Sequence, residues 1–408
     1  MRLFDRKFLT LLSAYTSSNL ADGIILLAFP LTAVAFGAEA WQTAVVAACT
    51  KVPWLILGLG AGVLGDSVDR LRMAQAAAAA RVLVLAGLTW LLLSGSTSLI
   101  LLAAAALTAG ACEVVFDVAG QTLTPAIVQR ANLVRANGYV SAAQNTSNEF
   151  VGPPLGGLLI GLAVWLPYAF SAAAYALVAV WMTSLHHTTR TVLSSIPEKP
   201  STAANLGEGL QFVYRAVFLR RLGAYLFGVY LVFGVWIGLF VFYISTISAL
   251  HLNPPELGAL MAVSAMGGVA GGLTANLLIN RLGEYAVLAL GASGWSLYML
   301  GPLISDSFWV VAVLMVAGSA LGTAMGVASF ALRLLSTPDQ LLGRVSSVFR
   351  LLTWGSLPLG SLVGAALSVA ASTSETMWMA TGAMVMLSAV ALVAFRGKGR
   401  PAQDPGAA

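Results

Sequence analysis

Charged side chains are scarce in this sequence: Lys, Arg, Asp and Glu together make up 9% of its 408 residues. Soluble globular domains carry about 25% charged residues because their surfaces face water. Hydrophobic residues reach 59% and the mean hydropathy is +0.87, so the scarcity of charge excludes an ordinary soluble protein. The chain is therefore predicted to be a membrane protein surrounded largely by lipid.

Cysteine and histidine are also rare, with 2 Cys and 3 His. Cys49 and Cys112 both lie inside apolar runs, where they indicate small packing residues rather than a disulfide framework or a zinc site. The adjacent His186 and His187 lie at the inner end of an apolar run and resemble interfacial loop residues. We therefore expect no metal, no cofactor and no enzymatic activity.

Apolar runs long enough to cross about 30 Å of hydrocarbon recur along the whole chain. Strands of a membrane barrel would instead alternate polar and apolar residues over about 10 positions, so continuous runs favour helices. No cleavable signal is evident, because the first run is long enough to stay in the bilayer. We expect about twelve transmembrane helices. They are placed at residues 8–36, 43–64, 74–93, 99–123, 137–162, 166–185, 217–248, 256–279, 286–304, 308–334, 345–371 and 375–395.

The positions of the basic residues predict the orientation. None of the 21 Lys and Arg lies in the expected outer connections, such as residues 37–42 and 94–98, whereas Arg70, Arg135 and Arg281 lie in inner ones. Positive charge stays on the cytoplasmic side, so an even number of spans places both termini in the cytoplasm of a multi-pass cell-membrane protein. The net charge of +5 is then a property of topology and indicates no nucleic-acid partner.

The longest hydrophilic stretch is central and divides the spans into two equal groups. Similar stretches recur in both groups: TPAIVQRANLVRAN begins at Thr124 and TPDQLLGRVSS at Thr337, and each precedes a glycine-proline cluster. Transporters use internal repeats of this kind to place a substrate site near the middle of the membrane. The predicted parts are an N-terminal six-helix bundle at 1–185, a cytoplasmic linker at 186–216, a C-terminal six-helix bundle at 217–395 and a tail at 396–408.

The stretch GVLGDSVDRLR resembles the loop signature of the major facilitator superfamily, with Gly62, Asp66 and Arg70 at matching positions. The resemblance covers essentially the whole chain and implies a monomeric transporter with the major facilitator fold. It also implies a cytoplasmic latch, in which Asp66 contacts the N-terminus of the helix beginning near Gly343 and Arg70 pairs with Asp117. A helix N-terminus favours such a carboxylate. The alternative, ordinary topology charge in a short loop, explains Asp66 poorly.

The predicted fifth span contains Gly152, Pro153, Pro154, Gly156 and Gly157. Each proline removes a backbone hydrogen bond and kinks the helix, while glycines allow a neighbouring helix to approach closely. The order GPPLGG resembles the antiporter signature of the superfamily, which implies an exporter. The surrounding stretch RANGYVSAAQNTSNEFVGPPLGG resembles the drug:proton antiporter branch that contains macrolide-efflux and enterobactin-exporter proteins. A packing kink without directional meaning is the alternative.

Two acids fall near the middle of predicted spans, Asp22 and Glu149. A charge at the bilayer centre costs at least about 2.5–3.5 kcal/mol, so such residues indicate function. Each acid shares a helical face with an amide, Asn19 or Asn145, and both acids are proton-coupling candidates. The alternative is a permanently paired carboxylate with Lys51 as its partner.

Glu113 and Asp117 form an i, i+4 pair on one face of the predicted fourth span, and Arg81 lies at a similar depth in the third. This arrangement predicts an ion-pair network that locks the two spans or supports the latch. Glu113 is the third proton-coupling candidate.

The predicted seventh span is rich in aromatic residues, of which Tyr230, Phe233 and Trp236 are expected to line a cavity for amphiphilic compounds. Asn19, Asn145 and Trp354 are expected to contribute to the same cavity. Packing against other helices is the alternative for these aromatic side chains.

These observations predict secondary active export of small amphiphilic organic molecules of drug, antibiotic or siderophore type by proton antiport. The partners are then a small-molecule substrate, protons and the lipid bilayer. A nutrient importer or uniporter of the same fold would leave the GPPLGG match unexplained. A flippase for lipid-like substrates stays open as a further alternative.

Overall fold

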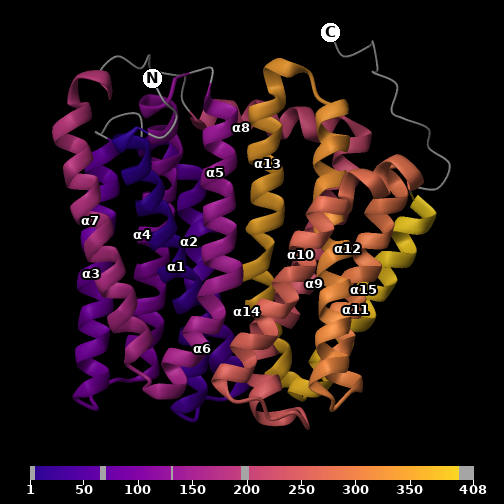
Figure 1. Cartoon of the computed structure of the whole chain (residues 1–408). Coiled ribbons are helices and arrows are strands. Elements are labelled where there is room, and N and C mark those ends of the chain that lie inside the picture. Colours follow the sequence, from indigo (N-terminus) through magenta and orange to yellow (C-terminus); the bar gives the residue numbers. More distant parts are fainter. Residues whose placement is uncertain (1–4, 65–69, 130–131, 194–201, 395–408) are drawn as a thin grey trace. The chain divides into compact units, whose positions relative to one another are not determined.

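The computed structural model describes residues 5–64, 70–129, 132–193 and 202–394, and every regular element within these ranges is helical (Figure 1). By their contacts the residues divide into two compact units, one comprising Met1–Thr202 and Leu252–Ala262, and the other Ala203–His251 and Val263–Ala408. We call them unit 1 and unit 2.

Long helices lying side by side build unit 1 (Figure 1). Its elements are α1 (Arg6–Ala35), α2 (Ala40–Leu64), α3 (Arg70–Leu93), α4 (Leu99–Ile127), α5 (Leu133–Asn145), the π-helical segment η2 (Thr146–Val151), α6 (Gly152–Leu162) and α7 (Leu166–Leu193). The first turns of α10 (Pro254–Leu282) also belong to this unit.

Unit 2 contains the rest of α10 and the remaining elements. These are α8 (Thr202–Arg215), α9 (Val217–Phe242), the π-helical segment η3 (Tyr243–Ile247), α11 (Glu284–Ile304), α12 (Phe308–Leu335), the 3-10 helix η4 (Asp339–Leu341), α13 (Leu342–Trp354), α14 (Ser356–Ala370) and α15 (Thr373–Ala394). The helix α8 occupies most of the described part of the predicted linker.

Within the described residues, 11 helical segments are long and apolar enough to cross a membrane. The predicted span at 137–162 is the twelfth and is not among these 11; there α5, η2 and α6 follow one another without a loop. The predicted all-α fold with twelve transmembrane helices is therefore confirmed. Its latch stays a prediction, since Asp66, the surroundings of Gly62 and the side chain of Arg70 lie outside the described residues.

The prolines explain the interruption in the fifth span. Pro153 and Pro154 have no amide hydrogen, so two backbone carbonyls one turn earlier lose their helical partners. The chain widens there into η2, where the amide of Gly152 donates to the carbonyl of Ser147 five residues earlier. Such π-helical turns often accompany kinks and functional sites. A π-helical turn followed by α6 therefore lies where the sequence predicts a kink.

Glycines bring the broken span into backbone contact with α1. A Cβ atom built on Gly152 would lie 2.6 Å from the Cα atom of Gly23, and one on Gly156 would lie 2.6 Å from the carbonyl oxygen of Ile24. These are distances that no side chain tolerates, so glycine is required if the two helices are to pack this closely.

Unit 2 repeats this arrangement between α14 and α9. A Cβ atom on Gly360 would lie 2.8 Å from the Cα atom of Gly234, and one on Gly364 would lie 2.8 Å from the carbonyl oxygen of Val235. Gly234 on α9 therefore occupies the place that Gly23 occupies on α1. This correspondence allows the residues beside the two glycines to be compared.

Candidate functional site

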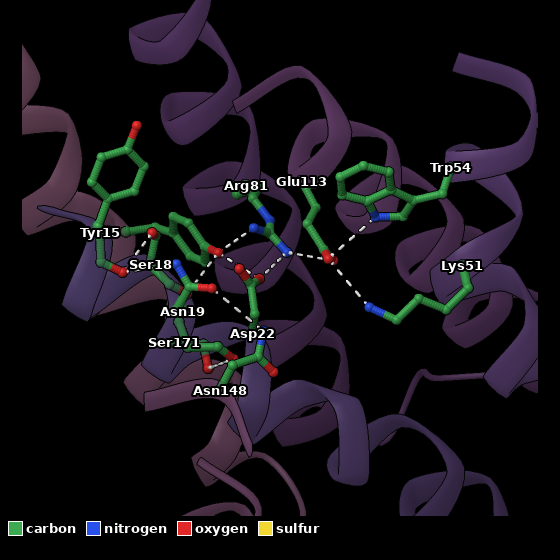
Figure 2. A network of polar contacts seen from close by, with 12 residues as sticks. Tyr15, Ser18, Asn19, Asp22, Lys51, Trp54, Arg81, Glu113, Asn148 and Ser171 are labelled. Atoms are coloured by element: carbon green, nitrogen blue, oxygen red, sulfur yellow. Dashed lines mark hydrogen bonds and ion pairs between the residues drawn. The ribbon is translucent and has the colours of Figure 1, made fainter. Parts of the chain in front are cut away.

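Three helices of unit 1 bring Asp22, Arg81 and Tyr175 together in its interior, and Figure 2 shows Asp22 beside Arg81. The Nη2 atom of Arg81 lies 2.5 Å from Oδ1 of Asp22, and the Tyr175 hydroxyl lies 2.6 Å from the same oxygen, to which it donates. Arg81 also donates to the Tyr175 hydroxyl, and its guanidinium carbon is 4.3 Å from the ring centroid. Because α1, α3 and α7 each supply one group, the cluster ties these three helices together.

Glu113 extends the cluster to α4 and α2. One carboxylate oxygen lies 3.7 Å from Nη2 of Arg81, and the other lies 3.2 Å from Nζ of Lys51. The indole nitrogen of Trp54 donates to that second oxygen over 3.3 Å. We call Asp22, Lys51, Arg81, Glu113 and Tyr175 the ionic network (Figure 2).

Apart from the half-buried Lys51, the ionic network is buried, and it is balanced in charge. Side-chain exposure is 1% for Arg81 and 6% for Asp22, so neither group reaches solvent in this conformation. Two carboxylates face two cations, which offsets the several kcal/mol that desolvation of each ion costs. Loss of one member would leave a buried charge without its partner. The network is therefore suited to hold five helices in one arrangement.

The sequence predicted only part of this network. Arg81 contacts Glu113, as expected, but it also reaches α1 through Asp22 and α7 through Tyr175. Lys51, considered as a partner for Asp22 or Glu149, pairs instead with Glu113, because α2 packs against α4. Asp117 is half-buried on α4, one turn from Glu113, and its predicted pairing with Arg70 stays a prediction.

Tyr175 and Trp54 were missed altogether. Both contribute neutral hydrogen-bond donors to carboxylates, and neither stands out among the other aromatic residues of the apolar runs. Each is far from its acid in the chain, so the only available signal was a polar tip on a residue within a span, which is common.

Glu149 lies in a different environment from Asp22. It is exposed on η2, near the middle of the broken span that runs from Leu133 to Leu162, and Asn145 one turn earlier is exposed as well. Its neighbour Asn148 points inward, and the Asn148 amide donates to the side-chain oxygen of buried Asn19 over 3.5 Å. Of the two mid-span acids, one is thus held in the ionic network and the other is open.

An aromatic cluster in unit 2 stands where unit 1 has its ionic network. Phe233 directly precedes Gly234, just as Asp22 precedes Gly23, and its ring is 4.3 Å from that of Trp295 on α11. Trp236 is fully buried, with its ring 5.4 Å from that of Tyr298 and 4.5 Å from that of Phe240. An apolar contact therefore replaces the Asp22–Arg81 pair in unit 2.

This cluster changes the interpretation of the predicted substrate cavity. Trp236 has no exposed surface and Phe233 stacks within the cluster, so both pack the interior of unit 2 in this conformation. The reason is the rotation of α9, which turns these side chains towards α11. Among the other predicted cavity residues, Tyr230 is half-buried, Asn19 is buried, and Trp354 and Asn145 are exposed.

Residues 8–404 match the family described as transmembrane secretion effectors. The multidrug efflux pump Tap of Mycobacterium tuberculosis is 28% identical over 382 residues, which cover 87% of this chain and 85% of that protein. The protein of the same name from Mycolicibacterium fortuitum is 25% identical over 405 residues, 94% of either chain.

Solved structures share the fold. The nucleoside transporter NupG has a TM-score of 0.79 at 13% sequence identity, covering 97% of this chain and 100% of that one. A bacterial homologue of the iron transporter ferroportin, in an inward-facing state, has a TM-score of 0.72 at 15% identity, covering 96% of this chain and 98% of that one. At these identities the likeness concerns the arrangement of helices and carries nothing about substrates.

Proposed function

Because the chain belongs to the transmembrane secretion effector family, within the major facilitator superfamily, we propose that it exports small amphiphilic organic molecules across the cell membrane in exchange for protons. The names of the two relatives, both multidrug efflux pumps, support export of drug-like compounds. The antiporter-like order GPPLGG in the fifth span supports the same direction of transport.

The proposal of exchange with protons rests on one observation, the exposure of Glu149 in the middle of a membrane span. A carboxylate facing lipid at that depth would cost at least about 2.5–3.5 kcal/mol, so it must face water, a substrate or other protein groups. A carboxylate on a water-filled path can take up a proton from one side of the membrane and release it on the other. We assign this role to Glu149.

Asp22 and Glu113 are the other two proton-coupling candidates, and their contacts favour a different role. Asp22 lies beside Arg81 and Tyr175, and Glu113 beside Lys51 and Arg81. A proton on either carboxylate would leave a buried cation without its full compensation. In our proposal these acids stay ionised during transport and hold the helices of unit 1 together.

The broken span links Glu149 to the rest of unit 1. Gly152 and Gly156, which follow Glu149 within two turns, lie against the backbone of α1 at Gly23 and Ile24. Further along, a Cβ atom on Gly157 would lie 2.2 Å from the carbonyl oxygen of Pro254, at the start of α10 and within unit 1. We propose that protonation of Glu149 alters η2, and that α6 transmits the change to these two contacts.

Accessible residues among those predicted for the cavity are retained as proposed substrate contacts. In unit 1 this is Asn145, the last residue of α5. Tyr230 and Trp354 are proposed for unit 2 separately. An aromatic ring offers a flat apolar surface to an amphiphilic molecule, and a mid-membrane carboxylate such as Glu149 favours a cationic one.

Everted membrane vesicles test the proposal directly. An imposed gradient, acidic inside, is expected to drive accumulation of a fluorescent cationic amphiphile, and Glu149→Gln is expected to lower this accumulation at least tenfold. The amide keeps the size of the side chain but cannot exchange a proton. Glu39→Gln is the matched control, because Glu39 is an exposed carboxylate in the connection between α1 and α2.

Two results would contradict the proposal. Dye movement down its own gradient, unaffected by the pH difference, would indicate a uniporter. Full pH-driven accumulation by Glu149→Gln would show that another group carries the proton. The amount of each variant in the membrane, measured by immunoblot, separates lost activity from lost protein.

A further inference from the structure

The helix α8 in unit 2 has an apolar face that the protein covers only along one edge. Gly209 and Val213 form the covered edge; a Cβ atom on Gly209 would lie 2.8 Å from the carbonyl oxygen of Arg344 at the start of α13. Leu210 and Tyr214 lie next to them around the helix, yet 57% and 69% of their surfaces are exposed. Two large apolar side chains on adjacent turns therefore point away from the protein.

Basic side chains follow this open edge in the chain, at the end of α8 and in the first two turns of α9. Arg215, Arg220 and Arg221 are exposed, and the guanidinium carbon of Arg220 lies 5.5 Å from the ring centroid of Tyr214. Among the described residues, none of these arginines forms an ion pair. We call Leu210, Tyr214, Arg215, Arg220 and Arg221 the α8 surface.

The acid within α8 does not offset the charge of the α8 surface. Glu208 is the one acid in the sequence of α8, and it forms an ion pair with Arg344 on α13. That pair, together with the close approach of Gly209, attaches α8 to α13. Arg220 donates to the backbone carbonyl of Tyr214 over 3.0 Å, and the rest of its guanidinium, like Arg215 and Arg221, stays exposed.

The position of α8 indicates what that partner is. A single residue, Ala216, separates the end of α8 from α9, whose membrane span begins at Val217. The α8 surface is therefore at the boundary between lipid and water. Helices at this boundary place Leu and Tyr at the edge of the acyl chains and arginines among the headgroups.

We propose that the α8 surface binds the headgroups of anionic phospholipids in the leaflet where α9 begins. Arg215, Arg220 and Arg221 would donate to phosphate oxygens, for which the guanidinium group is well suited. Leu210 and Tyr214 would enter the upper part of the acyl region. A second copy of the chain is a poorer occupant, because a symmetric dimer would bring two sets of three arginines together.

The proposal is tested on the full-length protein by native mass spectrometry during titration with phosphatidylglycerol or phosphatidylcholine. In the triple variant Arg215→Gln, Arg220→Gln, Arg221→Gln, we expect phosphatidylglycerol binding to weaken by about fivefold per arginine, and phosphatidylcholine binding to stay unchanged. The control variant, Arg6→Gln, Arg135→Gln, Arg281→Gln, loses the same charge at three exposed positions outside the α8 surface and is expected to bind both lipids as the unaltered protein does.

Three outcomes would overturn the proposal. Equal weakening in the control would mean that overall charge attracts the lipid. Unchanged phosphatidylglycerol binding in the triple variant would show that these three arginines do not bind the lipid. A dimer that dissociates only in the triple variant would assign the surface to a second copy. Equal thermal unfolding temperatures for both variants confirm that they are folded.

A fluorescent probe tests the apolar part of the α8 surface separately. Leu210→Cys, in a chain with Cys49→Ala and Cys112→Ala, is labelled with an environment-sensitive dye and placed in nanodiscs. The emission is expected to shift to shorter wavelengths when phosphatidylglycerol replaces half of the phosphatidylcholine. The shift should be absent when the three arginine substitutions are added; a shift that persists would contradict the assigned role of the arginines.

Discussion

Arg81→Met is expected to lower the free energy of unfolding by about 3–5 kcal/mol and to abolish transport. The guanidinium is 1% exposed, and its Nη2 atom is within 2.5 Å of Asp22 and 3.7 Å of Glu113. Methionine fills much of the same volume but leaves the Asp22 carboxylate buried, and among the described residues the Tyr175 hydroxyl is then its one remaining hydrogen-bond donor. Glu113 loses less, because Lys51 remains 3.2 Å away.

The double variant Asp22→Asn, Arg81→Met separates the loss of a partner from the loss of the pair. It contains no uncompensated charge, since Lys51 and Glu113 still face each other, so at least half of the lost stability should return. Unfolding in detergent, followed by circular dichroism against temperature, measures both variants. Arg135→Met on exposed α5 is the control and should change stability by less than about 0.5 kcal/mol.

The outcome that contradicts this account is a double variant no more stable than Arg81→Met. It would mean that Arg81 stabilises unit 1 through its contact with the Tyr175 ring rather than through charge. If the double variant regains stability and also transports, the ionic network contributes to stability alone. Recovery of stability without transport would instead assign it a part in the conformational cycle.

The helices were predictable because lipid leaves the backbone few choices. Each amide and carbonyl within the hydrocarbon must be paired inside its own segment, so a long apolar run is a helix whatever its neighbours are. The predicted span at 217–248 accordingly agrees with α9 and η3, which end at Ile247. The broken span was harder: α5 begins at Leu133, four residues before its prediction, because its first turns are polar.

The pairing of side chains across helices was less predictable. Glu113 and Asp117 were recognised as a pair because their spacing is local, and Arg81 because any buried arginine needs an acid. The choice of Asp22 as a partner of Arg81 depends on the rotation of α1 and α3 about their axes, which one sequence does not specify. For the same reason Phe233 and Trp236 were predicted to line a cavity, while the structure packs them against α11.

Gly152→Ala is expected to reduce pH-driven export at least tenfold. The added methyl group would lie 2.6 Å from the Cα atom of Gly23 and 2.8 Å from its carbonyl carbon. Both are backbone atoms, so no side chain can move aside and α6 must separate from α1. Gly138→Ala on α5 is the matched control, because a Cβ atom there meets nothing within 4 Å.

The equivalent change in unit 2 shows whether the contact of α6 with α1 has a special role. Gly360→Ala places a methyl group 2.1 Å from the carbonyl oxygen of Leu231 and should disturb packing at least as strongly. If coupling resides in unit 1, Gly152→Ala should also weaken the dependence of export on the pH gradient, whereas Gly360→Ala should lower the rate and keep that dependence. Export measured in everted vesicles at several imposed gradients distinguishes the two. The same loss of gradient dependence in both variants would contradict a coupling role confined to η2 and α6. The glycine contacts would then have the same role in both units.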